Sequence, residues 1–471
     1  MTALQHPGPD TGSAGPGPAG AAPHPRVPFP VVDEVARHCL QEEEPETVHI
    51  EVHLPGRPDP DRLTAAFVEA LKRHPRILMR EAPGPWYRRR YEWELTPGPE
   101  VEVVTFPEPG PDALKLARQR ALADAPPLSA SPPIRLEMVD DPEVPGGAVL
   151  FLVINHTALD GPACLRVLAT AAELYGGQDN SPVAPPVRAA SGDGPAAEPV
   201  DMPGGWATPA HVAPGLPEHS PGNGMLIAEL PVPKRPKGAA YTVNDQLMVA
   251  TALMIAHWNR EHGKGARPMR ITMPVDDRTR DADMPIGNGT RLVEVPFAAD
   301  ELVTGELDGD EMSADRVRDL LCRTAERTRA LKALSRPQLG RGANLLTAPV
   351  VPVSWRAALT RGLRRAAGPW TSTTLLSNIG RIPYALDFGD AGRAHAVWFS
   401  APARVPRGLT VTTASTAGRL HLALRWSKSL LSQGDGTHLR DLFEHYMHAT
   451  ELPAPEPDPT SGPTTSEGGD V

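Results

Sequence analysis

The stretch FLVINHTALDGPACLRVL, residues 151–168, changes character in its middle, and this change decides how the rest of the chain is interpreted. An apolar run ends at His156, a polar turn follows, and apolar residues resume with helical spacing after Asp160. The run predicts a buried strand, and the later spacing predicts a helix. The polar residues between them suit a simple turn, but they also suit an active site at the end of a strand.

His156 and Asp160 have a structural interpretation. Asp-Gly-Pro is a good helix start, with Asp160 as the N-cap and Pro162 in the first turn. His156 is then a strand-end histidine bonded to the backbone. Because the chain contains 16 histidines, a histidine and an aspartate four residues apart say little by themselves.

The same two residues also have a functional interpretation. A neutral imidazole at the end of a buried strand can take a proton from an attacking amine or hydroxyl, which is typically worth about 10²–10⁴ in rate. Asp160 lies beyond a tight turn and need not touch the ring. A buried carboxylate at this place needs a cation, so the functional interpretation requires an arginine from elsewhere in the chain.

Length and composition bound the class of protein. At 471 residues the chain is too long for one ordinary core, which favours two domains. Its hydrophobic residues (40%) and charged residues (22%) lie near the averages of globular proteins. A net charge of −10 argues against a general nucleic-acid binder, so we expect no nucleic-acid partner.

Cysteine usage and the absence of long apolar runs predict the compartment. Cys39, Cys164 and Cys322 stand far apart, which predicts neither a disulfide framework nor a zinc site and fits a reducing cytoplasm. The sequence shows no signal-peptide core and no apolar run long enough for a membrane span. We therefore expect a cytoplasmic protein without a membrane span and without a metal.

The chain divides into two blocks rich in helix and strand patterns. The blocks are residues 28–177 and 225–452, joined by a Pro/Gly-rich linker over 178–224. Residues 1–27 and 453–471 have few large apolar side chains, and we expect both tails to be disordered. Mixed helices and strands with antiparallel neighbours in both blocks predict the α+β class.

Several segments together resemble one superfamily. NHTALDG, residues 155–161, resembles the His-His-x-x-x-Asp-Gly signature of condensation domains and thioester- or CoA-dependent acyltransferases, which share the chloramphenicol-acetyltransferase fold. Five other segments are similar to that superfamily in the same order: RHPRIL (73–78), YTVNDQLMVATALMIAHW (241–258), MPVDDRTR with IGN (273–288), LLSNIGRIP (375–383) and GRLHLALRW (418–426). Each fragment is short, and their common order makes the resemblance specific.

The resemblance implies both an architecture and a set of site residues. Two chloramphenicol-acetyltransferase-like subdomains, each with mixed sheets and helices, would form a V with an active-site tunnel between them. His156 would be the catalytic base. Asp160 would be mainly structural and would pair with Arg278, which supplies the cation that the carboxylate requires. Gly161 would complete the motif as a structural residue at the active site.

The sequence departs from the signature at Asn155, which replaces the first histidine of the doublet. In the superfamily the second histidine carries the chemistry, and Asn155 can still form hydrogen bonds. Strand neighbours point to opposite faces, so we expect Asn155 to face the interior of its own domain when His156 faces the tunnel. Ser377 and Asn378 end a predicted strand and are candidate oxyanion donors, with a polar strand-to-turn pair as the open alternative.

These observations favour a stand-alone acyltransferase of specialised metabolism that forms an amide or an ester. It would move an acyl group from acyl-CoA or an acyl-phosphopantetheinyl carrier protein to a small-molecule amine or hydroxyl, as a monomer and with no tightly bound cofactor. Two alternatives stay open: a wax-ester or lipid-type O-acyltransferase, and a catalytically degenerate scaffold that binds a carrier protein. Asn155 favours the scaffold, whereas the presence of His156, Asp160 and Arg278 argues against it.

Overall fold

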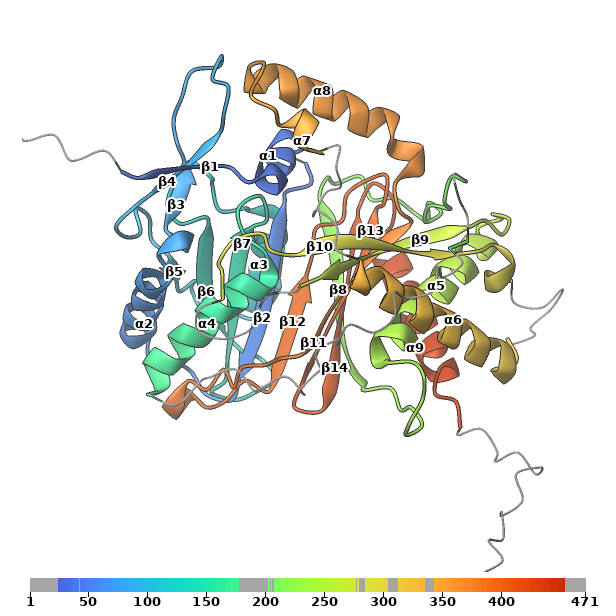
Figure 1. The fold of residues 1–471 in the computed structure, drawn as a ribbon. Coiled ribbons are helices and arrows are strands. Elements are labelled where there is room, and N and C mark those ends of the chain that lie inside the picture. Colours follow the sequence, from blue (N-terminus) through green and yellow to red (C-terminus); the bar gives the residue numbers. More distant parts are fainter. Residues whose placement is uncertain are drawn as a thin grey trace, which may run out of the picture.

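The computed structural model describes residues 24–41, 43–177, 202–203, 205, 207–276, 278, 284–303, 312–334 and 343–453. Within these residues the strands form three sheets, and the two larger sheets lie side by side with helices packed on them (Figure 1). The predicted α+β class with two subdomains is confirmed. None of the helices in the described part of the chain is long and apolar enough to cross a membrane.

The first half is built around the strand that ends at Asn155. Its five-stranded sheet has the order β12 (Ala396–Ser400), β2 (Thr47–Leu54), β7 (Ala148–Asn155), β6 (Ile134–Asp140) and β5 (Val104–Thr105). The strand β7 is antiparallel to both neighbours and buried along its whole length. The apolar run before His156 is therefore a central strand, as predicted.

Helices cover both faces of this sheet because the side chains of β7 alternate between two cores. Leu150, Leu152 and Ile154 face the main core with α2 (Pro60–Arg73) and α4 (Gly161–Gly176). Val149, Phe151 and Val153 pack with α3 (Ala113–Ala123) on the other face. At the edge of this half lie α1 (Val31–His38), η1 (Pro75–Ile77) and a small sheet of β1 (Arg26–Pro28), β4 (Glu92–Leu95) and β3 (Met79–Glu81).

The second half is built on a six-stranded sheet. Its order is β10 (Arg291–Phe297), β9 (Met269–Val275), β11 (Thr374–Arg381), β13 (Leu409–Thr416), β14 (Arg419–Ser427) and β8 (Asn223–Pro231). The helix α5 (Val243–Glu261) packs against α6 (Ala314–Ala333) and α9 (Gln433–Ala449), and η2 (Asp300–Leu302) lies beside it. Asp245 closes a capping box with Thr242 at the start of α5, which explains why this helix begins directly after Thr242.

A pair of helices lies apart from the six-stranded sheet. The helices α7 (Ala343–Leu346) and α8 (Val353–Ala366) contact α1 of the first half and are followed by η3 (Gly368–Trp370). Figure 1 shows α8 (orange) along the upper edge of the molecule, above α1 and the ends of the second-half strands.

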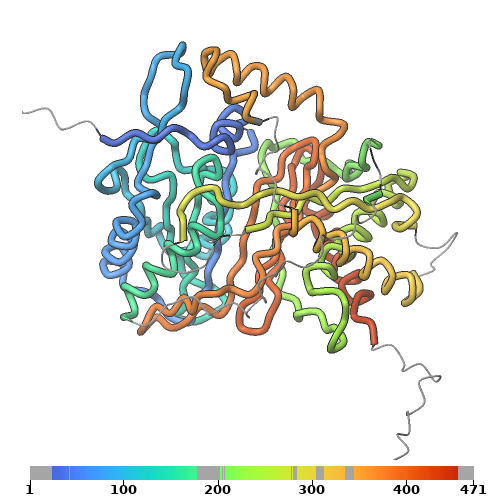
Figure 2. The backbone as a smooth tube through the Cα atoms, viewed as in Figure 1, coloured from blue at the N-terminus to red at the C-terminus, as the bar shows by residue number. Residues whose placement is uncertain are grey.

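The two halves are joined by a crossover that the sequence did not predict. The strand β12 follows η4 (Gly389–Ala391) in the second block, yet it pairs with β2 in the first sheet. Figure 2 shows this orange segment running into the blue and teal half. The buried Arg425 of β14 adds a second link, because it donates to the backbone oxygen (2.7 Å) and hydroxyl (2.9 Å) of Thr47. Residues 225–452 were predicted to form one subdomain, but β12, within this range, belongs to the sheet of the first half.

The predicted tail and linker boundaries also move. The strand β1 begins at Arg26, inside the range assigned to the first tail. Ala210, Val212 and Ala213 belong to the second core, inside the range assigned to the linker, and the Ala213 oxygen accepts from Trp258 (2.9 Å). Apolar contacts thus order segments whose Pro/Gly content suggested a linker. Residues 1–23, 178–201 and 454–471 lie outside the described residues.

Buried histidines make the stability of this fold depend on pH. Burial lowers the pKa of His38, His49 and His74 from 6.5 to about 4. The unfolded chain binds protons at these rings below about pH 6.5, whereas the folded chain keeps them neutral until about pH 4. Their full contribution to stability is therefore present above pH 6.5 and is lost as the pH falls toward 4.

We expect His74→Gln to reduce this loss of stability in acid. The Thr170 hydroxyl donates to the Arg166 oxygen (3.2 Å), so the His74 ring donates to Thr170 (2.8 Å), and a glutamine amide can replace that donor without titrating. Between about pH 7 and pH 4, the free energy of unfolding should fall by about 1–2 kcal/mol less in the variant, since His74 keeps some access to solvent. Urea denaturation at both pH values measures this, and an unchanged pH dependence would contradict it.

Candidate active site

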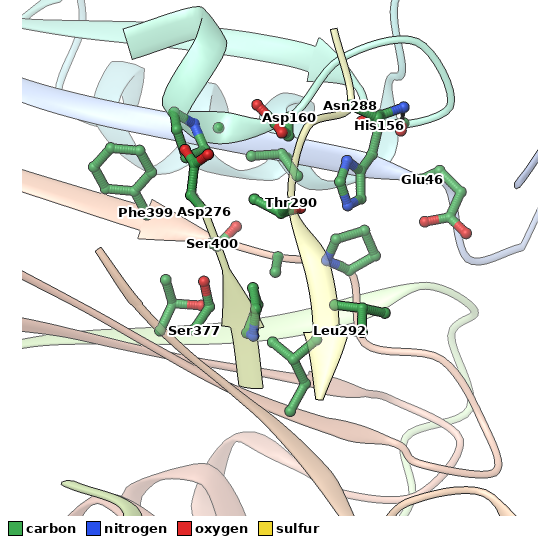
Figure 3. A pocket seen from close by; sticks show the side chains of 18 of the residues that line it. Glu46, His156, Asp160, Asp276, Asn288, Thr290, Leu292, Ser377, Phe399 and Ser400 are labelled. Atoms are coloured by element: carbon green, nitrogen blue, oxygen red, sulfur yellow. Dashed lines mark hydrogen bonds between the residues drawn. The ribbon is translucent and has the colours of Figure 1, made fainter. Parts of the chain in front are cut away.

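A cavity of about 420 Å³ lies between the two halves. Its wall is mostly apolar and includes Val48, Leu165, Leu292, Leu375 and Phe399. Polar side chains enter it from both halves, as Figure 3 shows for His156, Glu46, Ser377 and Ser400. The cavity therefore occupies the place where the resemblance put an active-site tunnel.

His156 follows β7 directly, and its imidazole is directed into the cavity (Figure 3). Its Nδ1 lies 2.9 Å from the backbone oxygen of Leu159. A carbonyl oxygen only accepts hydrogen bonds, so Nδ1 carries the proton and Nε2 presents a lone pair. The backbone N–H of His156 donates to the backbone oxygen of Glu46 (2.8 Å), which fixes the turn that holds the ring. The bond to Leu159 thus fixes the orientation of the ring and leaves Nε2 facing the cavity.

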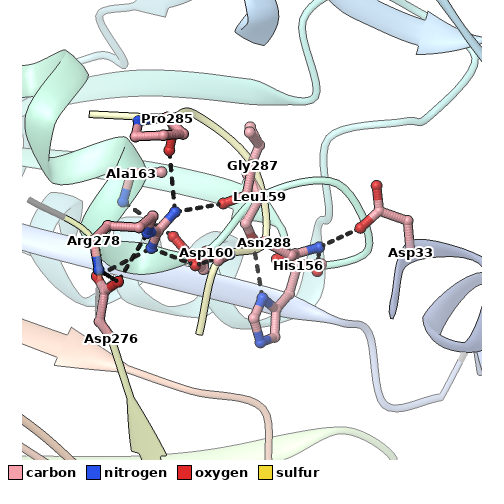
Figure 4. Close-up of polar contacts among 11 residues, drawn as sticks. Asp33, His156, Leu159, Asp160, Ala163, Asp276, Arg278, Pro285, Gly287 and Asn288 are labelled. Atoms are coloured by element: carbon pink, nitrogen blue, oxygen red, sulfur yellow. Dashed lines mark hydrogen bonds and ion pairs between the residues drawn. The ribbon is translucent and has the colours of Figure 1, made fainter. Parts of the chain in front are cut away.

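Asp160 serves both of the roles that the sequence offered. Its Oδ1 accepts from the backbone N–H of Ala163 (3.1 Å), so it is the N-cap of α4. Its Oδ2 accepts from Arg278 (2.7 Å) and from the backbone N–H of Gly289 (2.8 Å) (Figure 4). The carboxylate is buried, with its side chain 2% exposed. All of its bonds are structural, and none of them goes to the imidazole.

Arg278 is brought to Asp160 across 118 residues of sequence. Its guanidinium also contacts Asp276 (2.8 Å) and the backbone oxygens of Pro285 and Gly287 (Figure 4). Burial lowers the pKa of Arg278, but the two carboxylates more than offset this and raise it overall. The predicted pair is present as a network of one arginine and two aspartates.

Glycine is required next to this network. A Cβ at Gly289 would lie 2.3 Å from Nε of Arg278, so only a glycine leaves room for the guanidinium. Gly161, the first residue of α4, lies against Phe399 and lines the cavity. The close approach at Gly289 explains the glycine after the IGN segment, whereas a Cβ at Gly161 would make an ordinary contact with Phe399 (3.4 Å).

Asn288 is a site residue that the sequence analysis did not assign. Its amide donates to the backbone oxygens of His156 (3.3 Å) and Thr157 (3.0 Å) and to Asp33 (2.9 Å). Burial raises the pKa of Asp33 to about 6, against hydrogen bonds from Asn288 and Trp93 that lower it. Asn288 therefore ties the turn that carries His156 in the first half to the second half. The sequence did contain an indication of this role, because Asn288 belongs to the IGN segment that resembles the superfamily.

Asn155 points away from the cavity, as strand alternation predicts. It is buried, its amide donates to the Pro126 oxygen (3.0 Å), and its Oδ1 accepts from the Thr157 N–H (3.1 Å). It does not line the cavity that contains His156. These bonds support the turn after β7.

We expect Asn155→His to be tolerated. The side chain makes two bonds worth about 1 kcal/mol each, on the face of the sheet away from the cavity. Product formation with matched substrates should stay within about tenfold of wild type, a much smaller change than removal of a catalytic base causes. If Asn155→His gave activity to an otherwise inert protein, the scaffold alternative would be correct.

Ser377 and Asn378 both line the cavity from β11 but differ in their bonding. The Asn378 amide donates to Asn244 (3.3 Å), and its oxygen accepts from Gly380 (2.9 Å) and Thr413 (3.2 Å). Asn378 is thus engaged in holding the irregular end of β11. Ser377 has no such bonds among the described residues and is directed into the cavity (Figure 3), which leaves it as the better candidate donor.

Arginines give part of the cavity wall a positive character. Arg404 is paired with Glu46, and Arg278 neutralises the lining residues Asp160 and Asp276. Arg407 differs, because it donates only to the Ser372 (2.9 Å) and Thr272 (3.4 Å) hydroxyls and, among the described residues, is attracted by Glu294 without forming an ion pair with it. Burial lowers its pKa to about 10, so it remains a cation at neutral pH.

A cluster that could hold a metal lies outside the cavity. His53, Asp141 and His395 bring their ligand atoms within 4.8 Å of one another. The His53 ring is already bonded at Nδ1 by Asp141 (2.8 Å) and at Nε2 by Glu51 (2.9 Å). Burial lowers the pKa of His53, but the two carboxylates raise it overall, and both ring nitrogens are already engaged by these carboxylates.

Comparisons with known proteins identify the fold. No protein-family model matches the sequence. Rv2305, an uncharacterised protein of Mycobacterium tuberculosis strain H37Rv, is 29% identical over 385 residues, which is 75% of this chain and 83% of that protein. The trichothecene 15-O-acetyltransferase TRI3 of Fusarium sporotrichioides matches with a TM-score of 0.60 and 12% identity, over 91% of this chain and 96% of its own.

A condensation domain completes the comparison. A mutant of the starter condensation domain of rhizomide synthetase RzmA, in complex with C8-CoA and Leu-SNAC, matches with a TM-score of 0.56 and 13% identity, over 89% of this chain and 93% of its own. The chain has the condensation-domain fold. The resemblance inferred from the sequence is confirmed for the fold, which this O-acetyltransferase and this condensation domain share. In this condensation-domain fold, the cavity lies between the ends of β7 and β11.

Proposed function

We propose that this protein transfers an acyl group from a thioester to an amine or hydroxyl acceptor, with His156 as the general base. The single observation that carries the proposal is the fixed tautomer of His156, whose Nδ1 proton is held by Leu159 (2.9 Å). In the neutral ring Nε2 is unprotonated, and in a largely apolar cavity it is suited to accept a proton from a nucleophile. The likeness to acyltransferases and condensation domains supports the same class of chemistry.

The proposed reaction needs no protein nucleophile, because the acceptor attacks the thioester directly. The acceptor attacks the thioester carbonyl while Nε2 of His156 takes its proton, and a tetrahedral oxyanion forms. The C–S bond then breaks, and the imidazolium returns the proton to the leaving thiolate. We assign Ser377 as a candidate donor to the oxyanion, since its hydroxyl lines the same cavity. Asp160 and Arg278 act only by holding the turn that carries His156.

Product analysis tests the proposed function. The purified full-length chain is incubated with a panel of acyl-CoA and acyl-N-acetylcysteamine thioesters and with pooled amines and alcohols, and products are read by mass spectrometry. We expect thiol release that depends on an acceptor, together with an amide or ester whose mass is the sum of both parts less the thiol. No transfer to any acceptor, with binding of acyl carrier protein alone, would favour the scaffold alternative.

Arg407, which lines the cavity and forms no ion pair among the described residues, predicts how the donor is recognised. We propose that it binds a phosphate of the CoA or phosphopantetheine arm. Arg407→Gln should raise KM for acyl-CoA by about tenfold, the value of one charge-assisted hydrogen bond, because glutamine keeps a polar contact but loses the charge. The KM for the matching N-acetylcysteamine thioester, which lacks phosphates, should not change. Equal effects on both donors would show that Arg407 has only a structural role.

A further inference from the structure

The outer side of α8 is apolar, although it faces away from the protein. Trp355, Leu359 and Leu363 are 68%, 55% and 47% exposed and recur every four residues, so they form one stripe. The opposite side of α8 is buried against α1 and holds Arg356, which pairs with Glu34 (2.6 Å). A surface helix normally turns its polar residues outward, so this stripe is inverted relative to the usual pattern.

The stripe continues onto neighbouring segments. Further exposed apolar side chains are Trp86, Tyr87, Leu345, Val350 and Trp370. The loop with Trp86 is fixed to α8, because the N–H of Val353 donates to the Arg88 oxygen (2.9 Å). Figure 1 shows the β3–β4 loop beside α7 and α8 at the upper edge of the molecule. We call these eight residues (Trp86, Tyr87, Leu345, Val350, Trp355, Leu359, Leu363 and Trp370) the α8 surface.

The charge around the α8 surface is predominantly positive, and Glu92, which lies beside Arg89 and Arg90, is paired with Arg26 (4.0 Å). Five exposed arginines flank it: Arg89, Arg90, Arg361, Arg364 and Arg365. Residues 82–91 and 343–370 contain no aspartate or glutamate, although the whole chain has a net charge of −10. Tryptophan, tyrosine and arginine beside leucine are the residues that anchor a helix in the headgroup region of a membrane.

We propose that the α8 surface docks on an anionic lipid membrane, with α8 lying in the plane of the headgroups. The arginines match anionic headgroups, and the apolar stripe matches the boundary of the acyl chains. A second copy of the chain fits less well, because a symmetric interface would set the five arginines of one copy against those of the other, with Glu92 as the neighbouring carboxylate.

The helix α8 lies next to the cavity, which suggests a function for membrane docking. Arg364 in its last turn and Thr371 after η3 both line the cavity between the two halves. A membrane at the α8 surface would therefore lie next to the cavity wall, and an apolar substrate could pass between them without crossing bulk water. The docking itself does not depend on acyl transfer, because it rests on the exposed side chains alone.

Vesicle sedimentation with the full-length chain tests the proposal. Vesicles of phosphatidylcholine alone are compared with vesicles that also contain phosphatidylglycerol. We expect binding to the anionic vesicles, weakened by salt, and a shift of tryptophan fluorescence to shorter wavelength on binding. Leu359→Asp with Leu363→Asp should weaken binding at least tenfold, and Arg90→Gln with Arg365→Gln by about fivefold per arginine.

Leu216→Asp is the matched control. Leu216 is 74% exposed and lies outside the α8 surface, so this change adds a charge at an apolar site without altering vesicle binding. Equal losses in Leu216→Asp and in the Leu359/Leu363 variant would overturn the proposal, as would no binding to anionic vesicles. Light scattering tests whether a second copy of the chain binds the α8 surface instead. If the wild type were a dimer and the Leu359/Leu363 variant a monomer, the α8 surface would be a dimer interface.

Discussion

His156→Ala is expected to abolish acyl transfer while leaving the fold intact. The ring lines the cavity and makes one side-chain hydrogen bond, to the Leu159 oxygen (2.9 Å), so its removal leaves no packed core empty. Loss of a general base lowers turnover by about 10²–10⁴-fold. The initial rate of product formation at saturating substrate measures the effect, and urea denaturation should give a midpoint close to that of the wild type.

His262 offers a matched control for this substitution. Its Nδ1 also bonds a backbone oxygen, that of Trp258 (2.8 Å), but it does not line the cavity. His262→Ala should keep full turnover. Added imidazole should restore part of the activity of His156→Ala, because the space left in the cavity can admit a free base, and should do nothing for His262→Ala. Near wild-type turnover in His156→Ala would show that the general-base assignment is wrong.

The local structure around the motif could be predicted because it depends on short-range rules. The apolar run to Asn155 and the Asp-Gly-Pro helix start are contained in one segment, and β7 and α4 form as predicted. The alternation along β7 was enough to send Asn155 and His156 to different faces. Asp160 shows that the structural and functional interpretations were not rivals, since one carboxylate caps α4 and binds Arg278.

Long-range features could not be predicted in the same way. The strand β12 has the same apolar pattern whether it joins the first sheet or the second, and pairing with β2 depends on the whole assembly. Asn288 reaches His156 and Asp33 only after the two halves meet. The exposed tryptophans of the α8 surface look like core residues in a sequence, because periodicity does not say which side of a helix is covered.

Asp160→Ala is expected to give the largest loss of stability among the site variants. The carboxylate accepts three bonds, from Ala163, Gly289 and Arg278, and alanine can replace none of them. The loss of an N-cap costs about 0.5–2 kcal/mol, and breaking a buried ion pair costs about 3–5 kcal/mol when the remaining charge has no other partner. Asp276 still neutralises Arg278 in the variant, so we expect a total of about 3–5 kcal/mol in the free energy of unfolding.

Asp160→Asn separates the parts of this loss. The amide oxygen can still cap α4, but the amide has no charge and places a donor next to the Arg278 guanidinium and the Gly289 N–H, which both donate to Asp160 in the wild type. We expect Asp160→Asn to lower the free energy of unfolding by less than Asp160→Ala does, because the amide keeps the cap but loses the ion pair. Activity should follow stability in both variants, falling because the turn that carries His156 loosens. Surface substitutions typically change the free energy of unfolding by no more than about 0.5 kcal/mol. If Asp160→Ala changed it by no more than this, the network with Arg278 would not be what holds this turn.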